Sequence, residues 1–153
     1  MKKTSLLDKL CIAITTLFGI GYAPLFSGTL ASVVAVIVFL LIKTRLYFLI
    51  FTAISILLSF LLASRAEKIF KEKDCKKIVI DDFSGMLLAL LLVPYDIRFV
   101  VCAFILFRVF DAFKIPPIDK IERLNGAAGV VGDDLMAGFY SLVALQIVRL
   151  FVR

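Results

Sequence analysis

The sequence contains no histidine and only three cysteines among its 153 residues. The absence of histidine excludes a Ser-His-Asp triad, a phosphohistidine intermediate and a histidine general base. The cysteines, Cys11, Cys75 and Cys102, are too few and too scattered for a disulfide framework or a zinc site. Catalysis by this chain therefore has to use carboxylates, a metal ion, lysine or arginine, hydroxyl groups or a cysteine.

Several motifs of phosphate chemistry are also missing. The sequence has no P-loop lysine motif, no Asp-x-Asp nucleophile pattern and no acidic signature of the membrane alcohol-phosphatidyltransferases. Cys102 and Arg108 have the spacing of a cysteine-dependent phosphatase loop. The residues between them are apolar and predict a helix, whose backbone N–H groups are used internally and cannot hold a phosphate. This match is therefore spurious.

The composition indicates a membrane protein. The chain is 62% hydrophobic with a mean hydropathy of +1.06, whereas a soluble domain is closer to half apolar. Its net charge of +6 comes from basic residues that lie between apolar runs rather than along one face. Positive-inside bias and anionic lipid head groups explain this charge better than nucleic-acid binding does. We expect one membrane-embedded domain covering 1–153.

Apolar segments predict the fold, an all-α, multi-pass transmembrane helical bundle. Several of the segments are shorter than the ~20 residues of a perpendicular span, so short or partly submerged helices are expected. The first of the predicted helices precedes them, with Leu6, Leu7, Leu10 and Ile14 on one face and Lys2, Lys3 and Lys9 among its polar neighbours. This pattern favours an N-terminal interfacial amphipathic helix over a signal peptide, because no clear small-x-small cleavage site follows. The five apolar segments are 29–42, 46–63, 83–93, 97–110 and 135–152.

Positive residues predict the orientation. Segment 64–80 carries six Lys/Arg and is expected in the cytoplasm. Alternating spans then place the loop 22–28 and all of the acidic helix ends on the same side, with the C-terminus outside. The predicted location is the cytoplasmic (inner) membrane, with any site facing the cytoplasm.

Five carboxylates lie where charged segments meet apolar runs. Ionised carboxylates at such positions are costly unless they are paired or bind a metal, and several together repel one another without a cation. Helix capping is the simpler explanation for the two adjacent pairs, but Asp111 is expected at the C-terminal end of its helix, where a negative charge is unfavourable. We therefore predict a divalent-cation site. Its candidate ligands are Asp81, Asp82, Asp111, Asp133 and Asp134.

Two further features suit a phosphate. Arg108, Asp111 and Lys114 are spaced three apart and share a helical face, which predicts either an ion-pair ladder or a metal ligand flanked by two phosphate-binding cations. The turn Ser27-Gly28-Thr29 precedes an apolar helix, and it is either an N-cap or a cradle of backbone N–H groups.

With these motifs the chain resembles the phosphatidylglycerophosphatase A family over nearly its whole length. Four stretches carry the resemblance in order, namely 18–32, 81–86, 107–118 and 129–138. It implies a magnesium-dependent membrane phosphatase that converts phosphatidylglycerophosphate to phosphatidylglycerol. The chain departs from the family at Asp82, where Glu is usual, and at Ser27 and Ile115, where Pro is usual. The shorter Asp82 keeps the carboxylate, and the lost prolines concern loop rigidity.

The combined hypothesis is a lipid phosphatase that uses Mg²⁺. The carboxylates of the helix ends hold the ion, and Asp82 or Asp134 acts as general base. Arg108 and Lys114 clamp the phosphate, with N–H groups of 27–29 as further donors. Direct attack by water and an aspartyl-phosphate intermediate stay open, as do the number of metals and the oligomeric state. The alternatives are a small cation channel or transporter, which needs acids near mid-membrane, and a structural scaffold, which gives no reason for Asp111.

Overall fold

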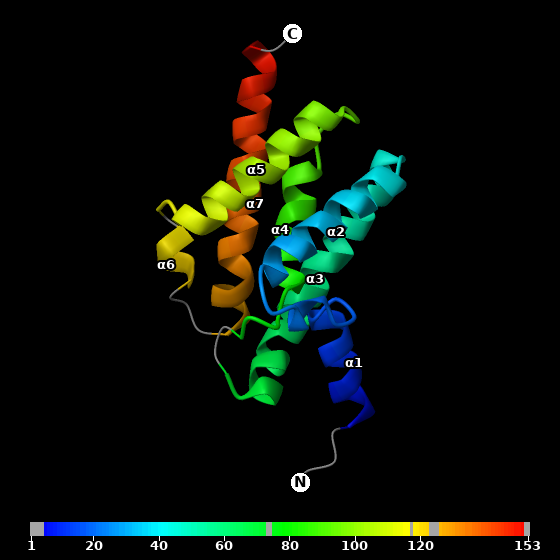
Figure 1. Ribbon diagram of the computed structural model, residues 1–153, viewed down its shortest axis with the longest axis vertical. Coiled ribbons are helices and arrows are strands. Elements are labelled where there is room, and N and C mark those ends of the chain that lie inside the picture. The colour runs from blue at the N-terminus through cyan, green and yellow to red at the C-terminus, as the bar shows by residue number, and fades with distance from the viewer. Residues whose placement is uncertain (1–4, 73–74, 117, 123–125, 152–153) are drawn as a thin grey trace.

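Every regular element in the computed structural model is a helix, over the described residues 5–72, 75–116, 118–122 and 126–151 (Figure 1). The predicted all-α class is therefore confirmed for this part of the chain. Two elements had no counterpart in the prediction, a 3-10 turn and the short α6. The elements are α1 (Leu6–Thr15), η1 (Ile20–Tyr22), α2 (Ser27–Leu41), α3 (Arg45–Phe70), α4 (Ile80–Leu90), α5 (Ile97–Phe113), α6 (Ile118–Glu122) and α7 (Ala127–Phe151).

The short helix α4 forms the centre of the molecule. It packs against α2, α3, α5 and α7, and nine of its 11 residues are buried. A helix that is apolar on nearly all sides needs partners around it, and α4 has them. Figure 1 shows α5 crossing in front of α7, with α4 beside α7, and with α1 and the C-terminal end of α7 toward opposite ends of the long axis. The first turn of α4 carries Asp81 and Asp82, so the central helix also begins the acidic cluster.

Helices α4 and α7 touch through their backbones at two glycines. A Cβ atom on Gly138 would meet the carbonyl oxygen of Gly85, and a Cβ on Gly85 would lie 2.5 Å from the carbonyl oxygen of Asp134. Neither approach leaves room for a side chain, because real Cβ atoms do not come within 3.0 Å of another heavy atom. The two glycines therefore set the spacing of the helices that carry Asp82 and Asp134.

We expect Gly138→Ala to destabilise the protein by about 1–3 kcal/mol, because the added methyl group overpacks a contact between two backbones. Gly132→Ala on the same helix is the matched control. There the new Cβ would meet the Cγ2 methyl group of Ile121, at 2.6 Å, so a side chain of the short α6 would have to shift instead of a backbone, and a smaller loss of stability is expected. Thermal unfolding of the purified proteins in detergent measures both. Equal melting temperatures for the two variants would contradict the assigned backbone contact.

A buried group of three serines joins α4 to α3. The Oγ atom of Ser84 lies 2.9 Å from that of Ser55 and 2.8 Å from that of Ser59. Ser59 is also within hydrogen-bonding distance of the carbonyl oxygen of Ile80, at 3.3 Å. All three hydroxyls have partners, so their burial carries no unpaired polar group. The cluster holds the first turns of α4 against α3.

Two helices, α3 with 26 residues and α7 with 25, are long and apolar enough to cross a membrane. The apolar helices α2, α4 and α5 have 15, 11 and 17 residues, below the ~20 of a perpendicular span. Large apolar side chains project from α3 and α7, Leu57 at 58% exposure and Ile147 at 52% among them. Exposed apolar area of this extent marks a membrane or protein interface. A bundle with five spans stays a prediction.

Several helix bounds differ from those predicted. Helix α3 runs to Phe70, well into the charged segment 64–80, and α5 continues through Phe113. Helix α7 begins at Ala127, eight residues before the expected start at 135. Its first residue is capped by a distant side chain, since the hydroxyl of Ser64 accepts a hydrogen bond from the Ala127 N–H at 2.9 Å. This cap comes from α3 and leaves no local signal in the sequence.

The N-terminal segment forms a helix, α1, as predicted. Leu6, Leu7 and Leu10 are exposed, at 73%, 59% and 51%, while Cys11 and Thr15 are buried against the bundle. Lys2 and Lys3 lie outside the described residues. The position of α1 at a membrane interface stays a prediction.

Candidate functional site

The starts of α2 and α4, the end of α5 and the second turn of α7 meet around a pocket of about 420 Å³. All ten residues predicted to bind metal or substrate, or to act in catalysis, line it, although they come from four separate stretches of the chain. The wall is completed by Phe26, Val130 and, from the connection between α3 and α4, Cys75, Lys76 and Ile78. The ten predicted residues are Ser27, Gly28, Thr29, Asp81, Asp82, Arg108, Asp111, Lys114, Asp133 and Asp134.

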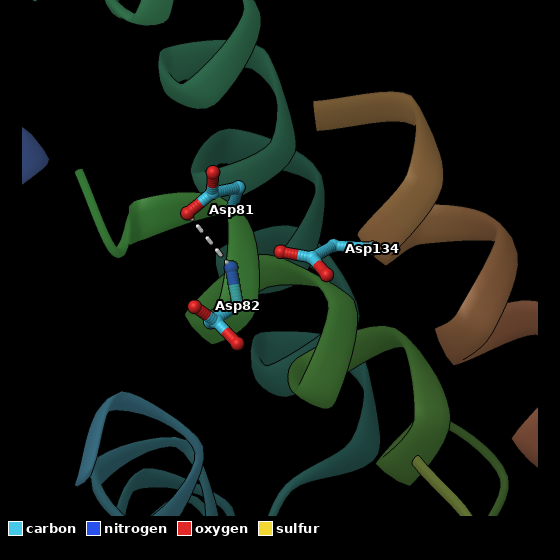
Figure 2. Close-up of side chains that lie close together, drawn as sticks. All are labelled: Asp81, Asp82 and Asp134. Carbon is cyan, nitrogen blue, oxygen red and sulfur yellow. Dashed lines mark hydrogen bonds between the residues drawn. The ribbon is translucent and has the colours of Figure 1, made fainter. Parts of the chain in front are cut away.

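Three of the five carboxylates form the tightest group. Asp81 and Asp82 come from the first turn of α4, and Asp134 reaches toward them from α7 (Figure 2). Each offers a carboxylate oxygen, and these oxygens all lie within 4.8 Å of one another. The carboxylate of Asp81 also accepts a hydrogen bond from the Asp82 N–H at 3.0 Å. Asp81 and Asp134 are each only 6% exposed, so water screens little of their mutual repulsion.

Burial and neighbouring charge perturb both acids at the start of α4, a helix too short to be one of the two candidate spans. Burial, with the nearby Asp82 adding to it, raises the pKa of Asp81 well above its usual range. Burial also raises the pKa of Asp82 to about 6; Asp111 adds to this shift and Arg108 opposes it. Carboxylates in such a setting favour a bound proton or a bound cation.

Asp111 and Asp133 line the same pocket but contact basic side chains. Arg108 donates from Nη1 to the carboxylate of Asp82 at 2.6 Å and lies 3.1 Å from that of Asp111. Lys114 donates to the carboxylate of Asp133 at 3.1 Å. The predicted Arg108–Asp111 pair of an ion-pair ladder is therefore present. Through its bond to Asp82, Arg108 also links α5 to α4. It therefore connects the grouped carboxylates to Asp111.

The expected position of Asp111 is confirmed, whereas the capping interpretation of Asp133 and Asp134 is wrong. Asp111 lies in the last turn of α5, where the helix dipole disfavours a negative charge and Arg108 compensates it. Asp133 and Asp134 lie in the second turn of α7, after its first turn, which contains no acidic residue. They cannot cap the start of α7, and their burial requires another explanation.

The predicted turn at 27–29 is the first turn of α2. The backbone N–H groups of a first turn have no carbonyl partner within their own helix, so this turn presents donors at the pocket. Ser27 donates from its hydroxyl to the carbonyl oxygen of Lys76 at 3.1 Å, which ties the turn to the chain before α4. A Cβ on Gly28 would meet the carboxylate of Asp82. The space beside Gly28, expected to admit a phosphate, is thus also needed by a candidate metal ligand.

The charges in the pocket determine what it can bind. Five carboxylates face three basic side chains, those of Lys76, Arg108 and Lys114. This balance repels a phosphate dianion unless a cation is present. The donors fit a hard cation, because a single ion with oxygen ligands at about 2.0–2.6 Å can contact all three grouped carboxylates after small side-chain movements. Lys76 was not singled out in the sequence, because nothing distinguished it from the other five basic residues of 64–80.

The chain is similar to known proteins over most of its length. The family model of Phosphatidylglycerophosphatase A matches residues 13–149. A Bacteroides thetaiotaomicron protein named "Putative phosphatidylinositol-3-phosphatase" is 33% identical over 97% of this chain and 98% of its own length. The phosphatidylglycerophosphatase A of Haemophilus influenzae is 32% identical over 95% of this chain and 91% of its own length.

The corresponding Escherichia coli enzyme is also 32% identical, over 81% of this chain and 74% of its own length. No solved structure matches the chain. The family model covers far more than half of the sequence, and it includes all ten residues of the pocket that were singled out above. The chain therefore belongs to the phosphatidylglycerophosphatase A family, a family of phosphatase enzymes.

Proposed function

We propose that this protein hydrolyses phosphatidylglycerophosphate to phosphatidylglycerol and phosphate, with Mg²⁺ as cofactor, at the cytoplasmic face of the inner membrane. The observation that carries the proposal is the pocket itself. It combines three grouped carboxylates, those of Asp81 and Asp134 buried, with Arg108, Lys114 and the start of α2, in a chain of the phosphatidylglycerophosphatase A family. Acidic residues explain the need for a cation, and the basic residues and helix start explain the choice of a phosphate.

The three grouped carboxylates, Asp81, Asp82 and Asp134, would hold the magnesium ion. Mg²⁺ prefers oxygen ligands and keeps several waters, which suits three carboxylates in a pocket. When bound, the ion screens the phosphate charge and lowers the pKa of a coordinated water. Asp111 and Asp133, candidate ligands from the sequence, take an outer position in this proposal, where they hold Arg108 and Lys114 in place.

The remaining residues bind the phosphate and manage the proton. Arg108 and Lys114 clamp the phosphate oxygens, and the amides of Ser27, Gly28 and Thr29 add donors that need no reorganisation. In direct hydrolysis a water oxygen attacks phosphorus, the bond from phosphorus to the glycerol oxygen breaks, and the leaving oxygen takes up a proton that replaces the one removed from the water. Asp82 or Asp134 removes the proton of the water. An aspartyl-phosphate intermediate is the alternative route, and trapping with a rapid quench separates the two.

The proposed orientation rests on the basic segment 64–80 and on the apolar surface. Segment 64–80 leads directly into α4, so a cytoplasmic position for it puts the pocket on that side. Helix α1, with its exposed leucines, is proposed to lie at the same interface. The acyl chains of the substrate then stay in the bilayer. A cation channel is less well supported, because the acids gather at helix ends beside Arg108 and Lys114 instead of following a path across the molecule.

Phosphate release by the purified protein in detergent tests the function. We expect release from phosphatidylglycerophosphate with Mg²⁺, none in excess chelator, and recovery when Mg²⁺ is restored. Phosphatidylinositol 3-phosphate is the informative second substrate, because the Bacteroides relative is named for it. Full activity in excess chelator would exclude the metal. If the protein hydrolysed only phosphatidylinositol 3-phosphate, it would still be a lipid phosphatase, but the proposed substrate would be wrong.

A further inference from the structure

A second cavity, of about 640 Å³, lies between α1, α2, α3 and α4. Among the described residues that line it, Ser55 alone is polar, and the Ser55 hydroxyl is already engaged with Ser84 at 2.9 Å. We call this cavity the apolar groove. Its lining residues are Ile14, Leu17, Phe18, Ile20, Val34, Val38, Phe51, Ile54, Ser55, Leu58, Ile80 and Phe83. A groove with this lining accepts hydrocarbon and offers nothing to a polar ligand.

The apolar groove and the carboxylate pocket adjoin the same turn of α4. Ile80 and Phe83 line the groove, while the two residues between them, Asp81 and Asp82, line the carboxylate pocket. Successive residues on a helix point in different directions, so one turn of α4 serves both spaces. The two spaces therefore lie on different faces of one helical turn, a width of about 10–12 Å that a phospholipid can span.

Helix α2 gives the groove its direction and its length. Gly28 lies at the carboxylate pocket, and Val34 and Val38 line the groove six and ten residues later. At 1.5 Å per residue these positions are roughly 9 and 15 Å farther along the axis. The hydrocarbon of one leaflet is about 15 Å deep, half of the ~30 Å core of a bilayer. The groove is also open to the surroundings, since Phe18 is 86% and Ile54 is 52% exposed.

We propose that the apolar groove holds one acyl chain of the phospholipid whose phosphate occupies the carboxylate pocket. This inference rests on the proposed lipid phosphatase function and adds a subsite to it. A chain that moves from bilayer hydrocarbon into an apolar groove gains little free energy, because both surroundings are apolar. Its contribution is orientation: the held chain fixes the glycerol and phosphate relative to Asp82. The enzyme therefore discriminates lipids by acyl chain length.

Filling the far end of the groove tests this subsite. We expect Val38→Phe to lower kcat/KM for a dipalmitoyl substrate about tenfold and to leave that for a dihexanoyl substrate unchanged, because the short chains end before Val38. Val33→Phe is the matched control: it makes the same change on the same helix, at a residue that is 41% exposed outside the groove. An unchanged chain-length preference in Val38→Phe, or an equal change in Val33→Phe, would overturn the proposal.

A second variant and a direct label cover the case in which Val38→Phe does not fold. Ile54→Phe fills the groove from an exposed position of α3, so it leaves the core intact and is expected to give the same loss of chain-length preference.

A phospholipid with a diazirine on its acyl chain should crosslink wild-type protein at residues of the groove. Crosslinks spread evenly over α3 and α7 would contradict the proposed subsite. No phosphate release from either chain length would instead refute the lipid phosphatase function, whereas the crosslinking result does not depend on turnover.

Discussion

Replacing Asp134 by asparagine is expected to reduce phosphate release on the order of a thousandfold, which is the scale of losing one charged contact in an active site. Asparagine keeps the size of the side chain but removes the charge that Asp134 contributes beside Asp81 and Asp82. The metal-free protein should not lose stability, because the change removes one of several like charges in a buried group. Activity at saturating Mg²⁺ and thermal unfolding in chelator measure the two effects separately.

Asp96→Asn is the control for that change. Asp96 caps α5 by accepting a hydrogen bond from the Arg98 N–H at 2.9 Å, and it does not line the carboxylate pocket. Its substitution should leave the rate unchanged and change stability little, because asparagine caps a helix about as well as aspartate does. If Asp134→Asn kept the wild-type rate, Asp134 would be neither a metal ligand nor a base. If the substitution unfolded the protein, the buried Asp134 side chain would be needed for the stability of the fold, and no role in chemistry would follow.

The second large effect is expected from Gly28→Val, with a loss of kcat/KM of at least about 100-fold. The new side chain would occupy the space of the Asp82 carboxylate, so Asp82 would have to turn away from Arg108, to which it is bonded at 2.6 Å. It would also cover the first amides of α2. The assay is phosphate release over a range of substrate and Mg²⁺ concentrations, so that a weaker metal affinity is distinguished from a weaker phosphate affinity.

A graded series makes the Gly28 result interpretable. Gly28→Ala should have an intermediate effect, since even one Cβ atom meets Asp82, and Thr29→Ala should have a smaller one because it removes only a hydroxyl from the pocket wall. Turnover by Gly28→Val with unchanged kcat/KM would show that the turn is only the start of a helix. Phosphate binding would then depend on Arg108, Lys114 and the metal alone.

The convergence of the site could be predicted because hydropathy and positive charge determine which helix ends share a side. That argument placed Asp81, Asp111 and Asp134 together without any knowledge of how the helices pack, and all three line one pocket. The finer grouping could not be predicted. The close grouping of Asp81, Asp82 and Asp134 depends on how α7 lies against α4, and the pairing of Lys114 with Asp133 depends on how α5 lies against α7.

Other features depended on contacts between segments far apart in the sequence. The start of α7 was misplaced because its cap comes from Ser64. Lys76 was overlooked because only the fold, in which its backbone carbonyl accepts a hydrogen bond from Ser27, sets it apart from the other basic residues of 64–80. The apolar groove was likewise absent from the prediction, since four helices contribute to it and each contributing residue resembles an ordinary core residue. Periodicity identifies helices, but it does not identify the hollow between them.

The paired glycines of α4 and α7 also matter for how this enzyme can evolve or be inhibited. Gly85 lies one turn after Asp81 and Asp82, and Gly138 lies one turn after Asp134, so the closest approach of the two helices is directly beneath the carboxylates. A substitution or a small molecule that separates the helices there by the width of one methyl group would move the carboxylates apart without entering the pocket. Two residues with no functional group thus limit which sequences are compatible with activity. The contact between α4 and α7 is in addition a target for inhibitors that need not resemble a phosphate.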